Sequence, residues 1–196
     1  VIKNISQSLP VEMDLLVKEH STMKLLGWRD LDFYKKILEM PNVKLIHPSV
    51  SIDSLIQNSS IVITIAGTSA FEAAFHKIPS IVFTNVIFSA LSCVFTVKIL
   101  DELPNIIKKC LSCKVDLTEL NHYVDQIKKS SFSVNVIDLT TVASQLFGIG
   151  GFLESNAISE SVMKKFLEEY KNEFDILANE HIKKIKSIKQ NENNKI

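Results

Sequence analysis

Residues 61–72 decide the fold, and they read Ile-Val-Ile-Thr-Ile-Ala-Gly-Thr-Ser-Ala-Phe-Glu. The run 61–65 is β-branched at every position, which predicts a buried strand. Gly67 then predicts a turn, and a helix is expected from Ser69 to about His76. Because the strand is a continuous run rather than an alternating one, both of its faces are expected to be covered, as in a parallel sheet.

Strands and helices alternate on both sides of this stretch. Three further strands are expected, at residues 15–18, 43–46 and 80–83. Helices are expected at residues 30–40, from Ser51 or Asp53, and at residues 103–111, 117–129, 140–147 and 159–189. This order predicts an α/β protein with a doubly wound parallel sheet, Rossmann-like, and a long C-terminal helix. The sheet domain is assigned to residues 1–150 and the helix with its frayed tail to residues 151–196, joined at Gly150-Gly151.

Composition excludes several classes of protein. Hydrophobic residues make up 46% of the chain, which is enough apolar surface for a folded core and excludes a disordered chain. The 22 basic residues balance the 22 acidic ones, so no net field favours nucleic acid as a partner. Three cysteines exclude a disulfide scaffold and favour a reducing, cytoplasmic compartment. No apolar run approaches the ~20 residues that a membrane-spanning helix needs.

The turn at residues 67–69 has the chemistry of an anion site. Backbone N–H groups at a helix start carry partial positive charge, and the hydroxyls of Thr68 and Ser69 add donors. Glu72, one turn later, is placed to accept hydrogen bonds from the vicinal hydroxyls of a ribose. An alternative stays open, in which Thr68 or Ser69 is only an N-cap and Glu72 its capping-box partner.

Polar side chains also follow two other predicted strands. Lys18 and His20 lie at the end of the strand at residues 15–18, and His47 follows the strand at residues 43–46. In a parallel sheet the carboxyl ends of the strands meet at one edge, where ligands of open α/β sheets bind. These residues are therefore expected to converge with the turn at residues 67–69.

The segments on which a family resemblance rests are Leu-Val-Lys-Glu-His (16–20), Gly-Trp-Arg (27–29), Phe-Tyr (33–34), Pro-Asn-Val-Lys-Leu-Ile-His-Pro (41–48), Ile-Thr-Ile-Ala-Gly-Thr-Ser-Ala-Phe-Glu-Ala-Ala (63–74) and Ile-Pro-Ser-Ile-Val-Phe (78–83). In this order they resemble the carboxy-terminal domain of GT-B glycosyltransferases, and most of all bacterial capsular or surface polysaccharide biosynthesis proteins. The resemblance covers about residues 9–83.

The resemblance implies roles for these residues. Lys18 and His20 stand where the family has a basic-His-Pro motif that contacts the donor phosphate, although Ser21 replaces the usual Pro. Gly67, Thr68 and Ser69 match the turn that holds the donor phosphates, Glu72 matches the residue that holds the ribose, and His47 is expected near the base. Lys18, His20 and the helix start offset phosphate charge, so the sequence demands no metal and no cofactor.

The function implied is transfer of a sugar from a nucleotide donor to a hydroxyl of a glycan or lipid-linked acceptor. The catalytic residues stay unknown, because in this family the base usually lies in an amino-terminal acceptor domain that this chain is expected to lack. Two alternatives stay open: a nucleotide-sugar 2-epimerase-like domain, and a non-catalytic α/β assembly module.

Two features further along the chain have other interpretations. Cys110 and Cys113 form a CxxC pair without a second ligand pair at zinc spacing, which favours structural thiols. Apolar residues recur every three or four positions from Val162 to Ile188, which predicts an amphipathic helix that forms a homo-oligomer or is mobile. Its basic end also suggests peripheral contact with the inner face of the cell membrane.

Overall fold

The computed structural model describes residues 1–20, 23, 27–147 and 159–193. The chain divides into two compact units, Val1–Gln126 and Ile127–Ile196. The joint predicted at residues 150–151 lies outside the described residues.

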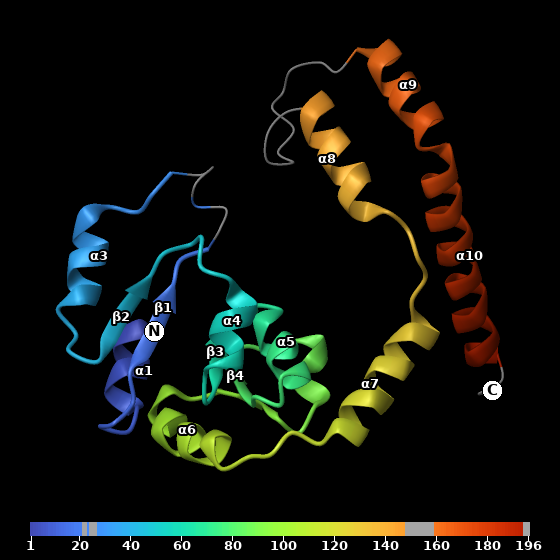
Figure 1. Ribbon diagram of the computed structural model, residues 1–196. Helices are drawn as coiled ribbons and strands as arrows, with labels where there is room; N and C mark the ends of the chain where they lie inside the picture. The colour runs from blue at the N-terminus through green and yellow to red at the C-terminus, as the bar shows by residue number, and fades with distance from the viewer. Residues whose placement is uncertain (21–22, 24–26, 148–158, 194–196) are drawn as a thin grey trace. The chain divides into compact units, whose positions relative to one another are not determined.

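The described strands all run parallel to their neighbours (Figure 1). They are β1 (Leu15–Lys18), β2 (Val43–Ile46), β3 (Val62–Thr64), β4 (Ser80–Val82) and β5 (Val94–Thr96). β1 pairs with β2 in one sheet, and a second sheet has the order β3-β4-β5. The predicted α/β class with parallel strands is therefore confirmed. The two sheets share no ladder of backbone hydrogen bonds, whereas the sequence had suggested one continuous sheet.

Helices separate most of these strands. In the first unit they begin with α1 (Ile2–Ser8), α3 (Leu31–Leu38), α4 (Ile52–Gln57), α5 (Ser69–Phe75) and α6 (Leu103–Leu111). Two short 3₁₀ turns, η1 (Ile87–Ala90) and η2 (Leu100–Glu102), precede and follow β5. α7 (Leu117–Ser130) begins in the first unit. The second unit holds α8 (Val136–Phe147), α9 (Glu160–Glu169) and α10 (Lys171–Asn193).

β4 is the centre of the first unit, and helices cover both of its faces. Val82 belongs to a buried cluster with Ala70 and Ala74 of α5, whereas Ile81 packs with Leu103 and Ile107 of α6. Since neighbouring residues of a strand point to opposite faces, α5 and α6 lie on opposite sides of this sheet. Because helices cover both of its faces, β4 is buried on both sides, as the continuous apolar run of its sequence predicted.

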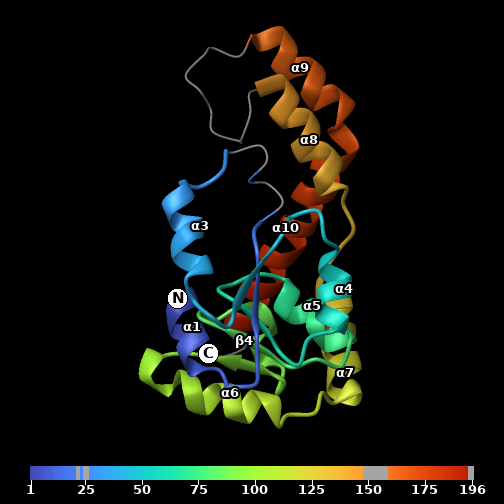
Figure 2. The ribbon, with the colours of Figure 1, turned by 60° about the vertical axis from the view of Figure 1, so that its left-hand side comes forward.

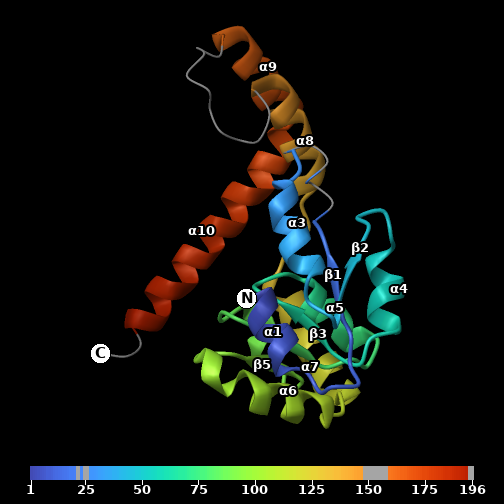
Figure 3. The ribbon, with the colours of Figure 1, turned by 90° about the vertical axis from the view of Figure 1, so that its left-hand side faces the viewer.

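The other sheet is also flanked by helices. Figures 2 and 3 show α1 and α3 on one side of β1 and α4 on the other. Leu15 of β1 packs against the cluster that contains Ile5 of α1 and Ile81 of β4. This shared cluster links the two sheets through side chains.

α5 packs closely on the second sheet because it presents small residues. Ala70, Ala73 and Ala74 are fully buried, with none of their surface exposed. The buried Ser80 hydroxyl of β4 donates a hydrogen bond of 3.0 Å to the Ala70 carbonyl oxygen. Together, these contacts fix the helix at the end of β3 and with it the turn that precedes the helix.

The cysteines lie in the first unit as free thiols. Burial raises the pKa of Cys110 to about 12 and that of Cys93 to about 11. Both thiols therefore remain protonated near neutral pH, whereas redox or metal chemistry requires a thiolate. Cys110 lies in α6 and Cys113 just after it, in line with the structural role predicted for the pair.

The second unit corrects the prediction of one terminal helix at residues 159–189. The helix is interrupted at Tyr170, whose φ of −102° and ψ of 20° separate α9 from α10. Phe166 and Tyr170 are buried, and the Tyr170 hydroxyl donates to Asp138 Oδ2 of α8 at 3.4 Å. α8 lies beside α9 (Figures 1 and 2), so the aromatic residues of the interruption pack between these helices.

Within the described residues, no helix has both the length and the apolar composition required to cross a membrane.

Replacing Tyr123 with Phe is expected to raise the free energy of unfolding. The Tyr123 hydroxyl oxygen is buried without a hydrogen-bond partner among the described residues, and burial raises its pKa. An unpaired buried hydroxyl costs ~1–3 kcal/mol, so its removal should recover about 1 kcal/mol. Urea unfolding followed by the fluorescence of Trp28, the single tryptophan, measures this in the first unit.

Tyr34→Phe is the matched control for this change. The Tyr34 hydroxyl donates to Glu19 Oε2 at 3.3 Å, so the same deletion should lower stability by ~0.5–1.5 kcal/mol. If Tyr123→Phe lowered the free energy of unfolding as much as Tyr34→Phe does, the Tyr123 hydroxyl would have a hydrogen-bond partner, which would contradict this prediction.

Candidate functional site

The first two strands end at one edge of their sheet, as predicted. Lys18 of β1 is paired with Ile46 of β2, so the residues that follow both strands leave from the same edge. Lys18 is half-buried, and His20 is exposed with its backbone N–H donating to Glu19 Oε1 at 3.0 Å.

His47 stabilises its own turn. Its Nδ1 lies 2.6 Å from the Ser49 hydroxyl and accepts a hydrogen bond of 3.2 Å from the Ser49 backbone N–H. Among the described residues, the opposite ring nitrogen, Nε2, has no hydrogen-bond partner.

The turn between β3 and α5 requires glycine. The Gly67 N–H donates to Thr64 Oγ1 at 3.1 Å, and a Cβ at position 67 would lie 2.7 Å from the same oxygen. Since real Cβ atoms do not approach other atoms so closely, any side chain here would displace Thr64. The glycine thus lets the chain turn tightly over the end of β3.

Thr68 and Glu72 interact directly across the first turn of α5. Thr68 Oγ1 donates to Glu72 Oε1 at 2.7 Å. No side chain caps the start of α5, so the capping-box alternative is wrong in the form stated above. Among the described residues, the backbone N–H groups of Thr68 and Ser69 have no acceptor. Two amides and the Ser69 hydroxyl therefore remain for an anion.

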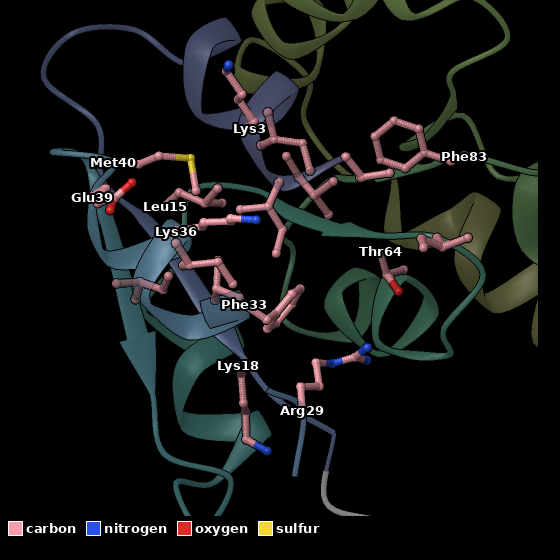
Figure 4. Close-up of a pocket in the computed structure, with 18 residues that line it drawn as sticks. Lys3, Leu15, Lys18, Arg29, Phe33, Lys36, Glu39, Met40, Thr64 and Phe83 are labelled. Carbon is pink, nitrogen blue, oxygen red and sulfur yellow. The ribbon is translucent and has the colours of Figure 1, made fainter. Parts of the chain in front are cut away.

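A pocket of about 820 Å³ lies between the two sheets, lined by residues of α1, β1, α3 and β3 (Figure 4). Most of its lining is aliphatic or aromatic. Lys18, Arg29 and Thr64 lie at its end near the carboxyl ends of β1 and β3. Figure 4 shows the Lys36 side chain extending toward the middle of the lining residues. Pockets of this size and composition are typical of small-molecule sites.

The pocket is positively charged. Its charged side chains are four basic ones and one acidic one, namely Lys3, Lys18, Arg29, Lys36 and Glu39. Lys3, Lys18 and Lys36 form no ion pair with any residue that the structure describes. Their charge is therefore available to an anionic ligand.

Glu19 organises the loop beside this pocket. Its side chain is 14% exposed and accepts hydrogen bonds from Arg29 Nε at 3.0 Å, from Tyr34 and from the His20 backbone. Burial by itself raises the pKa of Glu19, but these donors and the Arg29 charge outweigh it and hold the pKa below its usual value. The carboxylate therefore stays ionised and ties the loop and α3 to the end of β1.

Arg29 is oriented by two neighbours. Its Nε bonds to Glu19, and its guanidinium carbon lies 4.9 Å from the centre of the Phe33 ring. Figure 4 shows the guanidinium pointing toward Thr64. The terminal nitrogens of Arg29 have no hydrogen-bond partner among the described residues, and Arg binds phosphate or carboxylate with such paired donors.

The structure brings together only part of the predicted site. Lys18 is the one predicted site residue that lines this pocket, together with the end of β3. Gly67, Thr68 and Ser69 do not line it, and neither do His20, His47 and Glu72. Sequence reasoning missed Glu19 and Lys36, and it left open whether Arg29 lies beside the ligand or anchors a packed loop. Glu19 and Arg29 were inside the segments of the family resemblance, but the pairing of residues ten positions apart across a loop has no local signal.

Among the described residues, no group of three or more His, Cys, Asp or Glu side chains is placed to hold a metal ion. Comparisons with protein-family models, with curated proteins and with solved structures gave no match to this chain.

Replacing Glu19 with Gln is expected to destabilise the first unit near neutral pH. Charge-assisted hydrogen bonds are worth ~1.5–3 kcal/mol, so a loss of about 1–3 kcal/mol is expected at pH 7. Because the folded pKa lies below the ordinary value of 4.5, this stabilisation is present above pH 4.5 and is lost as the pH falls through the folded pKa. The two proteins should therefore converge in acid.

Urea unfolding at a series of pH values, followed by Trp28 fluorescence, measures this convergence. The control is Glu12→Gln, since Glu12 is exposed and has no hydrogen bond or ion pair among the described residues. A constant difference between wild type and Glu19→Gln from pH 7 to pH 3 would show that the Glu19 charge contributes nothing.

Proposed function

We propose that this chain is the donor-binding half of a GT-B glycosyltransferase in capsular or surface polysaccharide biosynthesis. In this proposal it binds a nucleotide-sugar and presents the sugar to a glycan or lipid-linked acceptor. The doubly wound arrangement belongs to the same proposal, in which β1 is next to β3 in the order β2-β1-β3-β4-β5. The described ladders form two separate sheets, β1-β2 and β3-β4-β5. A crevice where strand order reverses is the usual ligand site of such folds.

The observation that carries the proposal is the turn at the end of β3. Among the described residues, it combines two backbone N–H groups without acceptors, a Ser69 hydroxyl without a partner and a glycine whose replacement by any side chain would displace Thr64. Unpaired donors in a turn attract an anion because a buried or half-buried N–H gains a hydrogen bond when a phosphate oxygen arrives. Lys18 and Arg29, at the same end of the neighbouring pocket, add positive charge.

The proposed roles follow from these positions. The turn binds the donor phosphates, with Lys18 and His20 as further contacts. Glu72 uses Oε2 for the ribose hydroxyls, since Oε1 accepts from Thr68. His47 approaches the base.

The chemistry proposed for these residues is electrostatic. When the bond between sugar and phosphate breaks, negative charge develops on the departing nucleotide. Fixed N–H donors and cations lower the energy of that charge more than that of the intact donor, which is the condition for catalysis. The base that activates the acceptor hydroxyl is proposed to come from a separate domain.

The non-catalytic module remains the rival, and the Thr68–Glu72 hydrogen bond favours it, because the turn closes partly on itself. Nucleotide binding separates the two. A thermal-shift screen against CMP, UDP, GDP and CDP should give one stabilising nucleotide, because a ligand of the folded state stabilises it by mass action. No shift with any nucleotide at millimolar concentration would contradict the proposal.

Replacing Thr68 and Ser69 together with Ala is expected to weaken binding of that nucleotide at least several-fold. In this proposal the Ser69 hydroxyl donates to phosphate, and the Thr68 hydroxyl, which donates to Glu72 Oε1, orients that carboxylate for the ribose. A charge-assisted hydrogen bond to phosphate is worth ~1.5–3 kcal/mol. Isothermal titration calorimetry measures the affinity, and thermal unfolding of the free protein checks the fold.

The control removes two hydroxyls elsewhere, in Thr140→Ala/Thr141→Ala. Both are exposed on α8 and donate only to carbonyl oxygens of their own helix. Nucleotide affinity should not change in this variant. Unchanged affinity with reduced stability in the Thr68/Ser69 variant would favour a turn that serves the fold alone.

A further inference from the structure

The second half of α10 exposes an apolar stripe. Ile182, Ile185 and Ile188 are exposed by 48%, 52% and 46%, and Phe174 and Leu177 are half-buried. At about 100° per residue, Phe174, Leu177, Ile185 and Ile188 fall on one side of the helix and Ile182 lies at its margin. Such a stripe is costly to leave in water and normally has a partner.

Charge is distributed unevenly along the same helix. Residues 171–180 carry three acidic side chains and one basic one, whereas residues 181–190 carry four lysines and no acidic side chain. Four of the charges are paired within the helix, where Lys171 pairs with Asp175 and Lys183 with Glu180. Glu173, Lys184 and Lys186 form no ion pair with any described residue.

We propose that α10 pairs with α10 of a second copy of this chain in an antiparallel dimer. The antiparallel direction places the acidic half of one helix along the basic half of the other. A two-fold axis near residues 179–180 relates the copies, so that the interface uses one surface twice, as in most homodimers. This surface lies outside the candidate nucleotide site and is independent of the proposed function.

A single position of the two-fold axis brings apolar residues opposite apolar residues and acidic residues opposite lysines. With the axis at this position, Phe174 faces Ile185 of the other copy. Glu173 and Lys184 lie along one margin of the stripe, and in an antiparallel pair each margin meets the same margin of the other copy.

Asp175 and Lys186 lie along the opposite margin of the stripe. Each acidic residue is then within about one helical turn of the lysine on its own margin, a distance that a lysine side chain spans. Glu180 of both copies lies near the axis, where Lys183 of its own helix offsets its charge.

A parallel pair has none of these advantages. In a parallel pair each margin would meet the opposite margin of the other copy, which places Lys184 beside Lys186 and Glu173 beside Asp175, so like charges would repel along both margins. An anionic membrane would attract the lysines but leave the acidic half unpaired. The charge pattern therefore favours a second copy in the antiparallel direction.

The test uses the full 196-residue chain. Sedimentation equilibrium from about 1 to 200 μM should show a monomer–dimer equilibrium that weakens as NaCl is raised, because exposed ion pairs are screened. Lys184→Glu/Lys186→Glu should raise the dissociation constant at least ~10-fold, which corresponds to ~1.4 kcal/mol. Adding Glu173→Lys and Asp175→Lys to this variant exchanges both charges of each pair and should restore dimerisation.

The matched control is Lys128→Glu/Lys129→Glu, which makes the same change in charge at two exposed lysines of α7, outside the stripe. Its dissociation constant should stay within about threefold of the wild-type value at the same salt concentration. Circular dichroism checks that all variants keep their helix content.

Three results would overturn the proposal. One is a chain that stays monomeric up to 200 μM. Another is a dimer whose dissociation constant does not respond to Lys184→Glu/Lys186→Glu, or that the fourfold exchange does not restore. The last is a monomer that sediments with phosphatidylserine vesicles through Lys184 and Lys186, which would assign the stripe to a membrane surface.

Discussion

The close packing of α5 on β4 is the contact on which the first unit depends. Three alanines with no exposed surface allow the helix backbone to approach the strand, and the Ser80 hydroxyl bonds to the Ala70 carbonyl. A larger side chain at any of these positions would push α5 outward, since interiors packed at crystal density have no room for extra volume. Because Ser69 is the next residue, the same contact sets the position of the turn whose amides lack acceptors.

At the other sheet, polar contacts hold the neighbouring elements against the strand. Glu19 gathers Arg29, Tyr34 and the His20 backbone around one carboxylate, which joins β1, the following loop and α3. The aliphatic pocket separates this cluster from β3. The candidate site therefore has two parts. The packing of the α5 alanines positions the turn at the end of β3, and the hydrogen bonds to the Glu19 carboxylate position the residues at the end of β1.

Local patterns predicted much of the first unit. The strands at 15–18 and 43–46 begin and end where the sequence placed them, because Pro and Asn punctuate short apolar runs. β5 was missed, since Val-Phe-Thr is too short to stand out and its burial depends on β4. α1 was missed as well, because its seven residues carry only Ile2 and Ile5 as apolar positions.

The candidate site was predictable only where it is local. Gly67, Thr68 and Glu72 lie within one turn of chain, so their spacing predicted that they come together. Arg29 and Lys36 reach the pocket through a loop and a helix, whose positions follow from tertiary packing. The interruption at Tyr170 had no sequence signal either, because the apolar spacing continues across it while Tyr170 bonds to α8.

All three cysteines lie in the first unit, so a reagent that modifies thiols reacts with the first unit alone. Cys93 and Cys110 are buried and protonated, so an alkylating reagent reaches them only when the packing around β4 and α6 opens. The second unit has no cysteine. The rate of alkylation at Cys93 and Cys110 therefore measures how often the packing within the first unit opens.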